Sequence, residues 1–225
     1  VNRMIRIARS HYHCEIYIAL PVVVLYEYER TLKDFLQGIT ESFDGFLIRS
    51  VGQIELAKQM NVAFALDYNM NVFNIEARDF WIAQGASSIC PSQELNRAAF
   101  RALLKGKEAY IEQYVYGKLA LMHSSSCILK TTEGCRYQDH GNRLRLEDRK
   151  GEVLTTITNC QFCHNSIYNS KACYLLDVID EFSSLKRIEF TDEDAKSIID
   201  IFSKHNPYSF ADKNYTRGHY KRGVD

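Results

Sequence analysis

Three things are missing from this 225-residue sequence, and each absence narrows the class of protein. No apolar run approaches the roughly 18 residues that a membrane-spanning helix needs, and the longest one, residues 16–26, contains Pro21. No secretory signal is visible at the N-terminus. No net charge remains, because 28 lysines and arginines balance 28 aspartates and glutamates, so the overall charge indicates neither a nucleic acid nor an acidic membrane. We expect a cytoplasmic protein without a membrane span.

Strands and helices are predicted to alternate through the first half of the chain. Apolar and β-branched runs predict strands over residues 16–23, 44–50, 62–68, 86–90 and 109–115. Amphipathic spacing predicts helices over residues 26–39, 51–60, 75–84 and 94–104. This order is typical of parallel βαβ units and of the α/β class. A closed barrel needs eight such units and only about five are visible, so residues 1–116 are predicted to form the later part of a TIM-like (β/α) barrel.

The chain is predicted to contain a second region, residues 117–225, of a different kind. It is irregular and rich in cysteine, with an α+β character. Residues 143–158 predict a β-hairpin that turns at residues 149–151, and helices are predicted over 173–183 and 191–203. The tail from residue 203 is predicted to be irregular. Because Val1 already lies in a helix-like segment, we expect the missing first barrel strands to precede it in the same longer protein.

Seven cysteines are present, and four of them form two close pairs. Their spacing is Cys127-x7-Cys135-x24-Cys160-x2-Cys163. A C-x2-C pair lets two thiolates converge from one tight turn, and a second pair can complete a tetrahedral set. Without a secretory signal this pattern favours metal binding over disulfides. The spacing alone fits structural zinc and a [4Fe–4S] cluster equally well.

The remaining cysteines and the nearby histidines have less specific interpretations. Cys14, Cys90 and Cys173 are predicted to be small core residues, the last within a helix. His123 and His164 flank the paired cysteines, so either could be a ligand or a hydrogen-bond donor behind one. The simpler alternative is that both are ordinary loop histidines.

Familiar hydrolytic motifs are missing as well. The sequence contains no H-E-x-x-H, and no serine or cysteine stands out as an activated nucleophile beside a base. If the chain cleaves peptides, the carboxylates predicted at strand ends, Asp67, Glu94 and Glu112, could activate water. These carboxylates could equally accept hydrogen bonds from loop amides and cap helices. For Glu94, which opens a predicted helix, the helix dipole alone would account for its position.

Two further sets of residues could bind a substrate. The first set, at a predicted strand end, is Asn69, Asn71 and Asn74, whose amides could orient a polar group. The second set, in the C-terminal tail, is Arg217, His219 and Arg222, interleaved with tyrosines. Cations contact phosphates and aromatic rings stack on unpaired bases, so the tail is a candidate RNA contact. It could instead be a solvated terminus or pack over the metal loop.

Several segments together resemble the collagenase-like peptidases of family U32. They are DYNMNVFN (67–74), PSQEL (91–95), EQYVYGKLALMHSSSC (112–127), LEDRKGE (146–152), CQFCHNSIYNS (160–170) and YTRGHYKRGV (215–224). The resemblance covers nearly the whole chain, from about residue 16. Some members are described as peptidases of unassigned mechanism. Others are iron–sulfur proteins for oxygen-independent hydroxylation of RNA bases or ubiquinone precursors.

The resemblance therefore implies a peptide or RNA substrate, and it favours a [4Fe–4S] cluster over zinc. It carries over most safely to Cys127 and Cys135. The sequence departs from the family pattern at residues 121–123, where many members place a cysteine-bearing turn. That departure leaves the subgroup open between peptidase and hydroxylation chemistry. A third alternative is a non-catalytic barrel whose metal, zinc, is purely structural.

Overall fold

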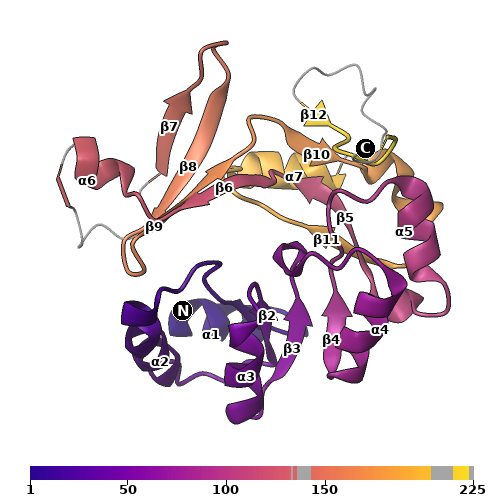
Figure 1. The fold of residues 1–225 in the computed structure, drawn as a ribbon, viewed down its shortest axis with the longest axis horizontal. Coiled ribbons are helices and arrows are strands. Elements are labelled where there is room, and N and C mark those ends of the chain that lie inside the picture. The colour runs from indigo at the N-terminus through magenta and orange to yellow at the C-terminus, as the bar shows by residue number, and fades with distance from the viewer. Residues whose placement is uncertain (133, 136–142, 204–214, 223–225) are drawn as a thin grey trace. The chain divides into compact units, whose positions relative to one another are not determined.

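The computed structural model describes residues 1–132, 134–135, 143–203 and 215–222 (Figure 1). The chain divides into two compact units. Unit 1 contains residues 1–92 and 109–111, and unit 2 contains residues 93–108 and 112–225. The predicted boundary followed residue 116, whereas this division already assigns residues 93–108 to unit 2.

Unit 1 is built on a parallel sheet whose strand order follows the chain order. Its strands are β1 (Tyr17–Ala19), β2 (Gly45–Ile48), β3 (Ala63–Leu66) and β4 (Ala86–Ile89). The apolar runs that predicted these strands carry its core, because Phe46, Ile48, Leu66 and Ile89 are fully buried. Such continuous apolar runs are typical of parallel strands covered on both faces.

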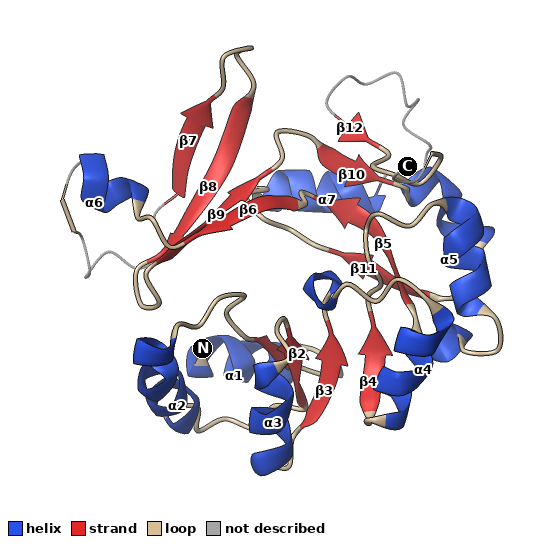
Figure 2. Ribbon diagram, in the orientation of Figure 1, coloured by secondary structure: helices blue, strands red, loops and turns tan. Residues whose placement is uncertain are grey.

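Helices connect these strands, as the sequence predicted (Figure 2). The connecting helices are α2 (Glu29–Gln37), α3 (Gly52–Gln59) and α4 (Ile75–Ala83), together with the short 3₁₀ helices η1 (Tyr26–Tyr28) and η2 (Tyr68–Met70), and α1 (Asn2–His11) precedes β1. Helix α2 buries Leu32 and Leu36, four residues apart on one face. In the part of the chain that the structure describes, no helix is long and apolar enough to cross a membrane.

Unit 2 contains a mixed sheet with the order β11-β5-β10-β12. Strand β5 (Glu112–Gly117) runs parallel to β11 (Leu185–Ile188) and antiparallel to β10 (Ala172–Tyr174), which pairs in parallel with β12 (Tyr215–Thr216). Tyr116, Tyr174 and Ile201 form its core. The helical elements of this unit are α5 (Arg97–Leu104), α6 (Ile128–Thr132), α7 (Ala195–Ser203) and η4 (Leu176–Glu181), and η3 (Glu108–Tyr110) lies where the chain passes between the units.

A second sheet of unit 2 is antiparallel throughout. Its order is β6-β9-β8-β7, formed by β6 (Ala120–Ser124), β9 (His164–Tyr168), β8 (Val153–Asn159) and β7 (Arg143–Glu147). Strands β7 and β8 are the predicted hairpin, which is confirmed. Strands β6, β9 and β11 were not predicted, because their sequences mix polar and apolar residues without regular alternation.

The barrel prediction is not confirmed, although the α/β class is. Among the described residues the three sheets are open, and none closes into a barrel. The predicted fifth strand contacts the sheet of unit 1 through a single parallel bridge between Ile111 and Ile89. From Glu112 onward it pairs with β10 and β11 instead.

The predicted helix over residues 173–183 is wrong. Cys173 lies in strand β10, and the following 3₁₀ helix η4 is interrupted at Val178, whose φ of −122° is not helical. The apolar spacing of Leu175, Leu176 and Val178 fits a helix and a buried strand end equally well, and pairing with β5 decided between them. The last predicted helix is present but begins at Ala195 rather than at residue 191.

Candidate functional site

The antiparallel sheet of unit 2 brings Cys127 and the second cysteine pair to one end. Ser124, the last residue of β6, is opposite Asn165 near the start of β9, and Asn159 is opposite His164 across the β8–β9 turn. Cys160 and Cys163 therefore lie in this turn. Cys127 follows the end of β6 by three residues, so the segment leading into α6 leaves the same end of the sheet (Figure 1).

Local hydrogen bonds hold the individual thiols. The Lys130 amide donates to Cys127 Sγ at 3.4 Å, and the Cys163 thiol donates to the carbonyl oxygen of Cys160 at 3.8 Å. Cys163 has a φ of 46°, in the left-handed region that side chains rarely adopt. This conformation lets the chain reverse within the C-x2-C turn.

The pKa of the Cys160 thiol indicates that the four cysteines are neighbours. Burial raises this pKa above its ordinary value of 9.0, and a hydrogen bond to Thr158 opposes the shift. Negative charge on Cys127, Cys135 and Cys163 raises it further. However, among the described residues no group of three or more histidine, cysteine, aspartate or glutamate side chains is arranged to hold a metal ion.

The donor chemistry fits a thiolate-bound metal centre. All seven cysteines lie in the described residues and are free thiols, so none of the four is committed to a disulfide. Four thiolates are the set that zinc or a [4Fe–4S] cluster takes. The residues that could hold such a group are therefore Cys127, Cys135, Cys160 and Cys163.

The other cysteines occupy the core, with one exception. Cys90 is fully buried and Cys173 is 4% exposed, as predicted for small core residues. Burial raises the pKa of the Cys173 thiol to about 12, which keeps it protonated and unreactive. Cys14 is exposed, so the prediction that it belongs to the core is wrong. It lies between α1 and β1, where the chain has left regular structure.

The two histidines lie on strands rather than in loops. His123 belongs to β6, and its Nδ1 forms a hydrogen bond of 2.9 Å with the Ser166 hydroxyl. His164 is the first residue of β9 and is 6% exposed. The loop interpretation is therefore corrected, because the pairing of β6 and β9 was not visible in the sequence.

Asp67 is fully buried just beyond the end of β3 in unit 1. Its carboxylate accepts hydrogen bonds from Arg49 Nε at 2.8 Å and from the Tyr68 amide at 2.8 Å. Arg49 follows β2, and Gln53 in turn accepts hydrogen bonds from the Arg49 and Ser50 amides. Asp67 therefore caps η2 and forms an ion pair at the carboxyl ends of two neighbouring parallel strands.

The three asparagines that follow Asp67 have local structural roles. Asn74 is the N-cap of α4, and its side-chain oxygen accepts a hydrogen bond from the Ala77 amide at 2.8 Å. Asn71 ends η2 with a φ of 50°, a left-handed conformation that asparagine tolerates. Asn69 lies within η2. These residues follow the strand end as predicted, and shaping its loop accounts for two of them.

The two glutamates belong to unit 2 and differ in their surroundings. Glu112 opens β5 and pairs with Arg187, whose Nε and Nη2 lie 2.6 and 2.5 Å from Glu112 Oε2. Glu94 is exposed in a turn. Helix α5 begins at Arg97 with Asn96 as its N-cap, so the prediction that Glu94 opens this helix is wrong. A capping asparagine was the stronger signal.

The tail residues are attached to their own unit. Arg217 forms an ion pair with Asp177, with only 15% of its side chain exposed, and the Tyr220 hydroxyl donates to Glu181. The Arg97 amide donates to the Tyr220 carbonyl at 2.8 Å. His219 and Arg222 are exposed. Residues 215–222 therefore contact β5, β10, α5 and η4.

A comparison with protein-family models decides the family. The model of Peptidase family U32 matches residues 1–145. The chain belongs to Peptidase family U32. No curated protein and no solved structure matches it. The match includes Cys127 and Cys135 but ends before the second cysteine pair, so the expected resemblance over nearly the whole chain extends beyond what the family model covers.

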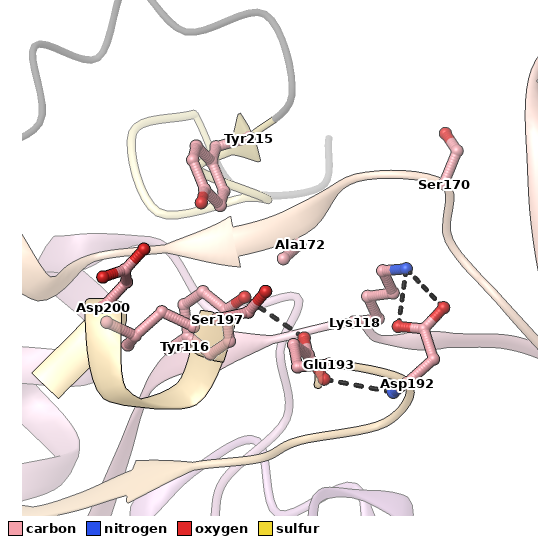
Figure 3. Close-up of a pocket in the computed structure, with 10 residues that line it drawn as sticks. Tyr116, Lys118, Ser170, Ala172, Asp192, Glu193, Ser197, Asp200 and Tyr215 are labelled. Carbon is pink, nitrogen blue, oxygen red and sulfur yellow. Dashed lines mark hydrogen bonds and ion pairs between the residues drawn. The ribbon is translucent and has the colours of Figure 1, made fainter. Parts of the chain in front are cut away.

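Sequence reasoning missed one pocket of this U32 protein (Figure 3). It has a volume of about 400 Å³ and is lined in part by Tyr116, Lys118, Asp192, Glu193 and Tyr215. Lys118 Nζ lies 2.8 Å from Asp192, and the Tyr116 hydroxyl donates to Glu193 at 3.1 Å. Burial, followed by the charge of Glu193, strongly raises the pKa of Tyr116. These residues come from separate strands and loops, so no local pattern joined them.

Proposed function

We propose that this U32 protein holds a [4Fe–4S] cluster through Cys127, Cys135, Cys160 and Cys163. The observation that carries the proposal is the pairing of β6 with β9, which supports one shared site for two distant cysteine pairs. The charges of the other three thiols also raise the pKa of Cys160, after burial and against the Thr158 hydrogen bond. Neither observation depends on the family match.

Zinc and a [4Fe–4S] cluster place different demands on four thiols. A zinc ion bonds all four sulfurs at about 2.3 Å, so they must crowd around a single point. In a [4Fe–4S] cluster each thiolate binds a different iron, so the sulfurs stand farther apart. The preference for the cluster comes from the family resemblance, and metal analysis distinguishes the two.

The residues around the cysteines would tune such a centre. When bound, a cluster supplies electron transfer or an iron site for a small donor molecule. The Lys130 amide donates toward Cys127, and Thr158 forms a side-chain hydrogen bond with Cys160. Hydrogen bonds to the sulfurs stabilise the thiolates and adjust the reduction potential of a cluster. We assign these two groups that role.

For the chemistry, we propose oxygen-independent modification of an RNA base or a quinone precursor. A cluster bound by the four cysteines would supply the redox chemistry that this modification needs. Exposed Arg222 provides a cationic group for phosphate contacts and His219 is exposed near it, whereas Arg217 forms an ion pair with Asp177. Peptide hydrolysis is the second candidate, supported by family membership and by the Arg49–Asp67 pair at two strand ends.

We further propose that unit 1 is part of a (β/α) barrel. The all-parallel order of its sheet supports this, as does the bridge between Ile89 and Ile111. In such barrels the carboxyl ends of the strands build the active site. Arg49 and Asn69 follow such strand ends and would face the substrate, whereas the buried Asp67 would hold Arg49 in place.

The deciding experiment is metal analysis of the longest natural form of the protein, purified without oxygen. A brown protein with about four irons and matching sulfide per chain, which bleaches on reduction, supports the cluster. A colourless protein that contains one zinc supports the structural alternative and overturns the cluster. Incubation with RNA and with gelatin then distinguishes the two substrate classes.

The peptidase candidate needs its own control. Gelatin cleavage that persists with chelators but disappears in Glu112→Gln would support carboxylate chemistry. Because Glu112 also pairs with Arg187, Arg187→Met serves as a matched variant that breaks the ion pair and keeps the carboxylate. Equal loss in both variants would assign Glu112 a structural role. Cleavage that survives substitution of Asp67, Glu94 and Glu112 would exclude the proposed carboxylate mechanism.

A further inference from the structure

Asn165 lies between the two segments that carry the cysteines. It is in strand β9, two residues beyond Cys163, and its neighbours across the sheet are Ser124 on β6 and Thr158 on β8. Its side chain is buried, since the residue is only 1% exposed. Asn165 therefore lies next to the loop that leads to Cys127 and next to the turn that contains Cys160 and Cys163.

The Asn165 amide connects β9 to the Cys127 loop. Its Nδ2 donates to the carbonyl oxygen of Ser126 at 2.7 Å, with a longer contact of 3.4 Å to that of Ser124. A side-chain amide carries two N–H groups, so it can serve both acceptors. The reversed orientation would bring three oxygens together, which confirms that the nitrogen faces the loop. Ser126 directly precedes Cys127.

The oxygen atom of the same amide indicates that Asn165 has a role beyond stabilising the fold. Asn165 Oδ1 is buried, and the described residues provide no hydrogen-bond partner for it. A buried polar atom without a partner is unfavourable for folding. An apolar side chain would avoid that cost inside the sheet. Only a donor at this position, however, can hold the Ser126 carbonyl, which lies beyond the end of β6, together with the carbonyl of Ser124 at the strand end.

We propose that Asn165 is the positioning residue of the four-cysteine centre, which fastens the Cys127 loop to the strand that follows the C-x2-C turn. This inference rests on the proposed function, because it assigns a role toward the same metal centre. The amide fixes the point from which the chain departs toward Cys127. It thereby keeps the first cysteine pair within reach of Cys160 and Cys163. Groups behind metal ligands typically change metal affinity by about 10–100-fold when they are removed.

The test compares metal binding by Asn165→Asp and Asn165→Ala with two matched controls. Asn165→Asp keeps the shape but replaces the donors with a carboxylate that repels the carbonyls. Asn169→Ala removes an amide beyond the other end of β9, where its oxygen accepts a hydrogen bond from the Lys171 amide. Ser166 is the next residue of β9 after Asn165, and Ser166→Ala removes the hydroxyl that contacts His123. Cobalt(II), titrated into the metal-free protein, reports thiolate ligation by its colour.

We expect both Asn165 variants to bind cobalt about 10–100-fold more weakly and to retain less iron and sulfide, measured at a temperature where thermal unfolding shows each metal-free variant to be folded. The two controls should match the wild-type protein. Wild-type metal content and affinity in Asn165→Asp would overturn the inference and leave the proposed function intact. Failure of the wild-type protein to bind either metal would overturn both.

A measurement on the wild-type protein covers the case in which the variants do not fold. The side-chain amide protons of Asn165, followed by nuclear magnetic resonance, should exchange with solvent at least about tenfold more slowly than those of Asn169, because they are buried and hydrogen-bonded. Equal exchange rates would show that the amide does not hold the loop, and would overturn the inference.

Discussion

At the scale of single residues, the contribution of an ion pair to stability depends on how deeply its charges are buried. Asp67 is fully buried, and the side chain of its partner Arg49 is 22% exposed. The pair Arg6–Glu41 joins side chains that are 71% and 31% exposed. Water screens the second pair, whereas the first holds a carboxylate that cannot be solvated. The two pairs therefore differ in importance despite the same distance of 2.8 Å.

Removal of Arg49 should expose this difference. Arg49→Met leaves the buried Asp67 carboxylate without its cation, and we expect a loss of about 3–5 kcal/mol in the free energy of unfolding. Arg6→Met is the matched control and should cost less than about 1 kcal/mol. Urea denaturation of both variants measures the difference. Similar losses would show that Asp67 is stabilised by its amide contacts alone.

The cysteines allow a second prediction at this scale. Cys127→Ser and Cys160→Ser should each lose the metal centre, because each removes one thiolate from the proposed set. Cys173→Ser should keep it, because Cys173 is buried in β10 and belongs to the core. Iron and sulfide content after anaerobic purification gives the answer. Equal metal loss in all three variants would mean that the ligand set is misassigned.

At the scale of elements, the end of β5 depends on a glycine. Gly117 has a φ of 146°, which side chains rarely adopt. A β-carbon there would meet the Tyr114 hydroxyl and would lie 2.7 Å from the Glu189 carbonyl oxygen. The turn between β5 and β6 therefore has no room for a side chain, and it links the two sheets of unit 2.

Gly117→Ala should destabilise the protein by about 1–3 kcal/mol, the range typical of a strained backbone conformation. Gly52→Ala is the matched substitution, since Gly52 lies in α3 and a β-carbon there meets nothing within 4 Å. Alanine in a helix is favoured over glycine, so that variant should gain roughly 0.5–1 kcal/mol. Thermal unfolding distinguishes the two, and a neutral Gly117→Ala would contradict the steric argument.

At the scale of the whole molecule, acid sensitivity should arise partly from Asp192. Burial pulls its pKa upward, but hydrogen bonds from Lys118 and Thr155 and the charge of Lys118 outweigh it, so the pKa falls below 3.8. A carboxyl group whose pKa is lower in the folded state stabilises the protein above its unfolded pKa. This stabilisation disappears as the pH falls through the folded value.

Lys118→Met should therefore reduce stability at neutral pH, and its difference from the wild-type protein should shrink as the pH drops below 3.8. Lys150→Met is the control, because backbone amides are the main cause of the lowered pKa of its neighbour Asp148. Urea denaturation across this pH range provides the measurement. A difference that does not change with pH would show that Lys118 acts through packing rather than charge.

Prediction from the sequence succeeded where the pattern is local. The strands and helices of unit 1 follow from apolar spacing, and the hairpin of β7 and β8 follows from its turn signal at Gly151. Prediction failed at Cys173, where the same apolar residues suit a helix or a strand. It also missed β6, β9 and β11, whose strand character depends on partners far away in the chain.

The candidate site likewise combines features that the sequence predicted with features that only the structure showed. The sequence by itself determined the family, the four cysteines as a candidate thiolate set and the polar residues after each parallel strand, because those features lie in residue type and spacing. Only the tertiary structure decided that Asn165 joins two cysteine segments and that Glu112 is paired with Arg187, 75 residues away. Such contacts arise from strand pairing and burial, which depend on the whole chain rather than on any local window of it.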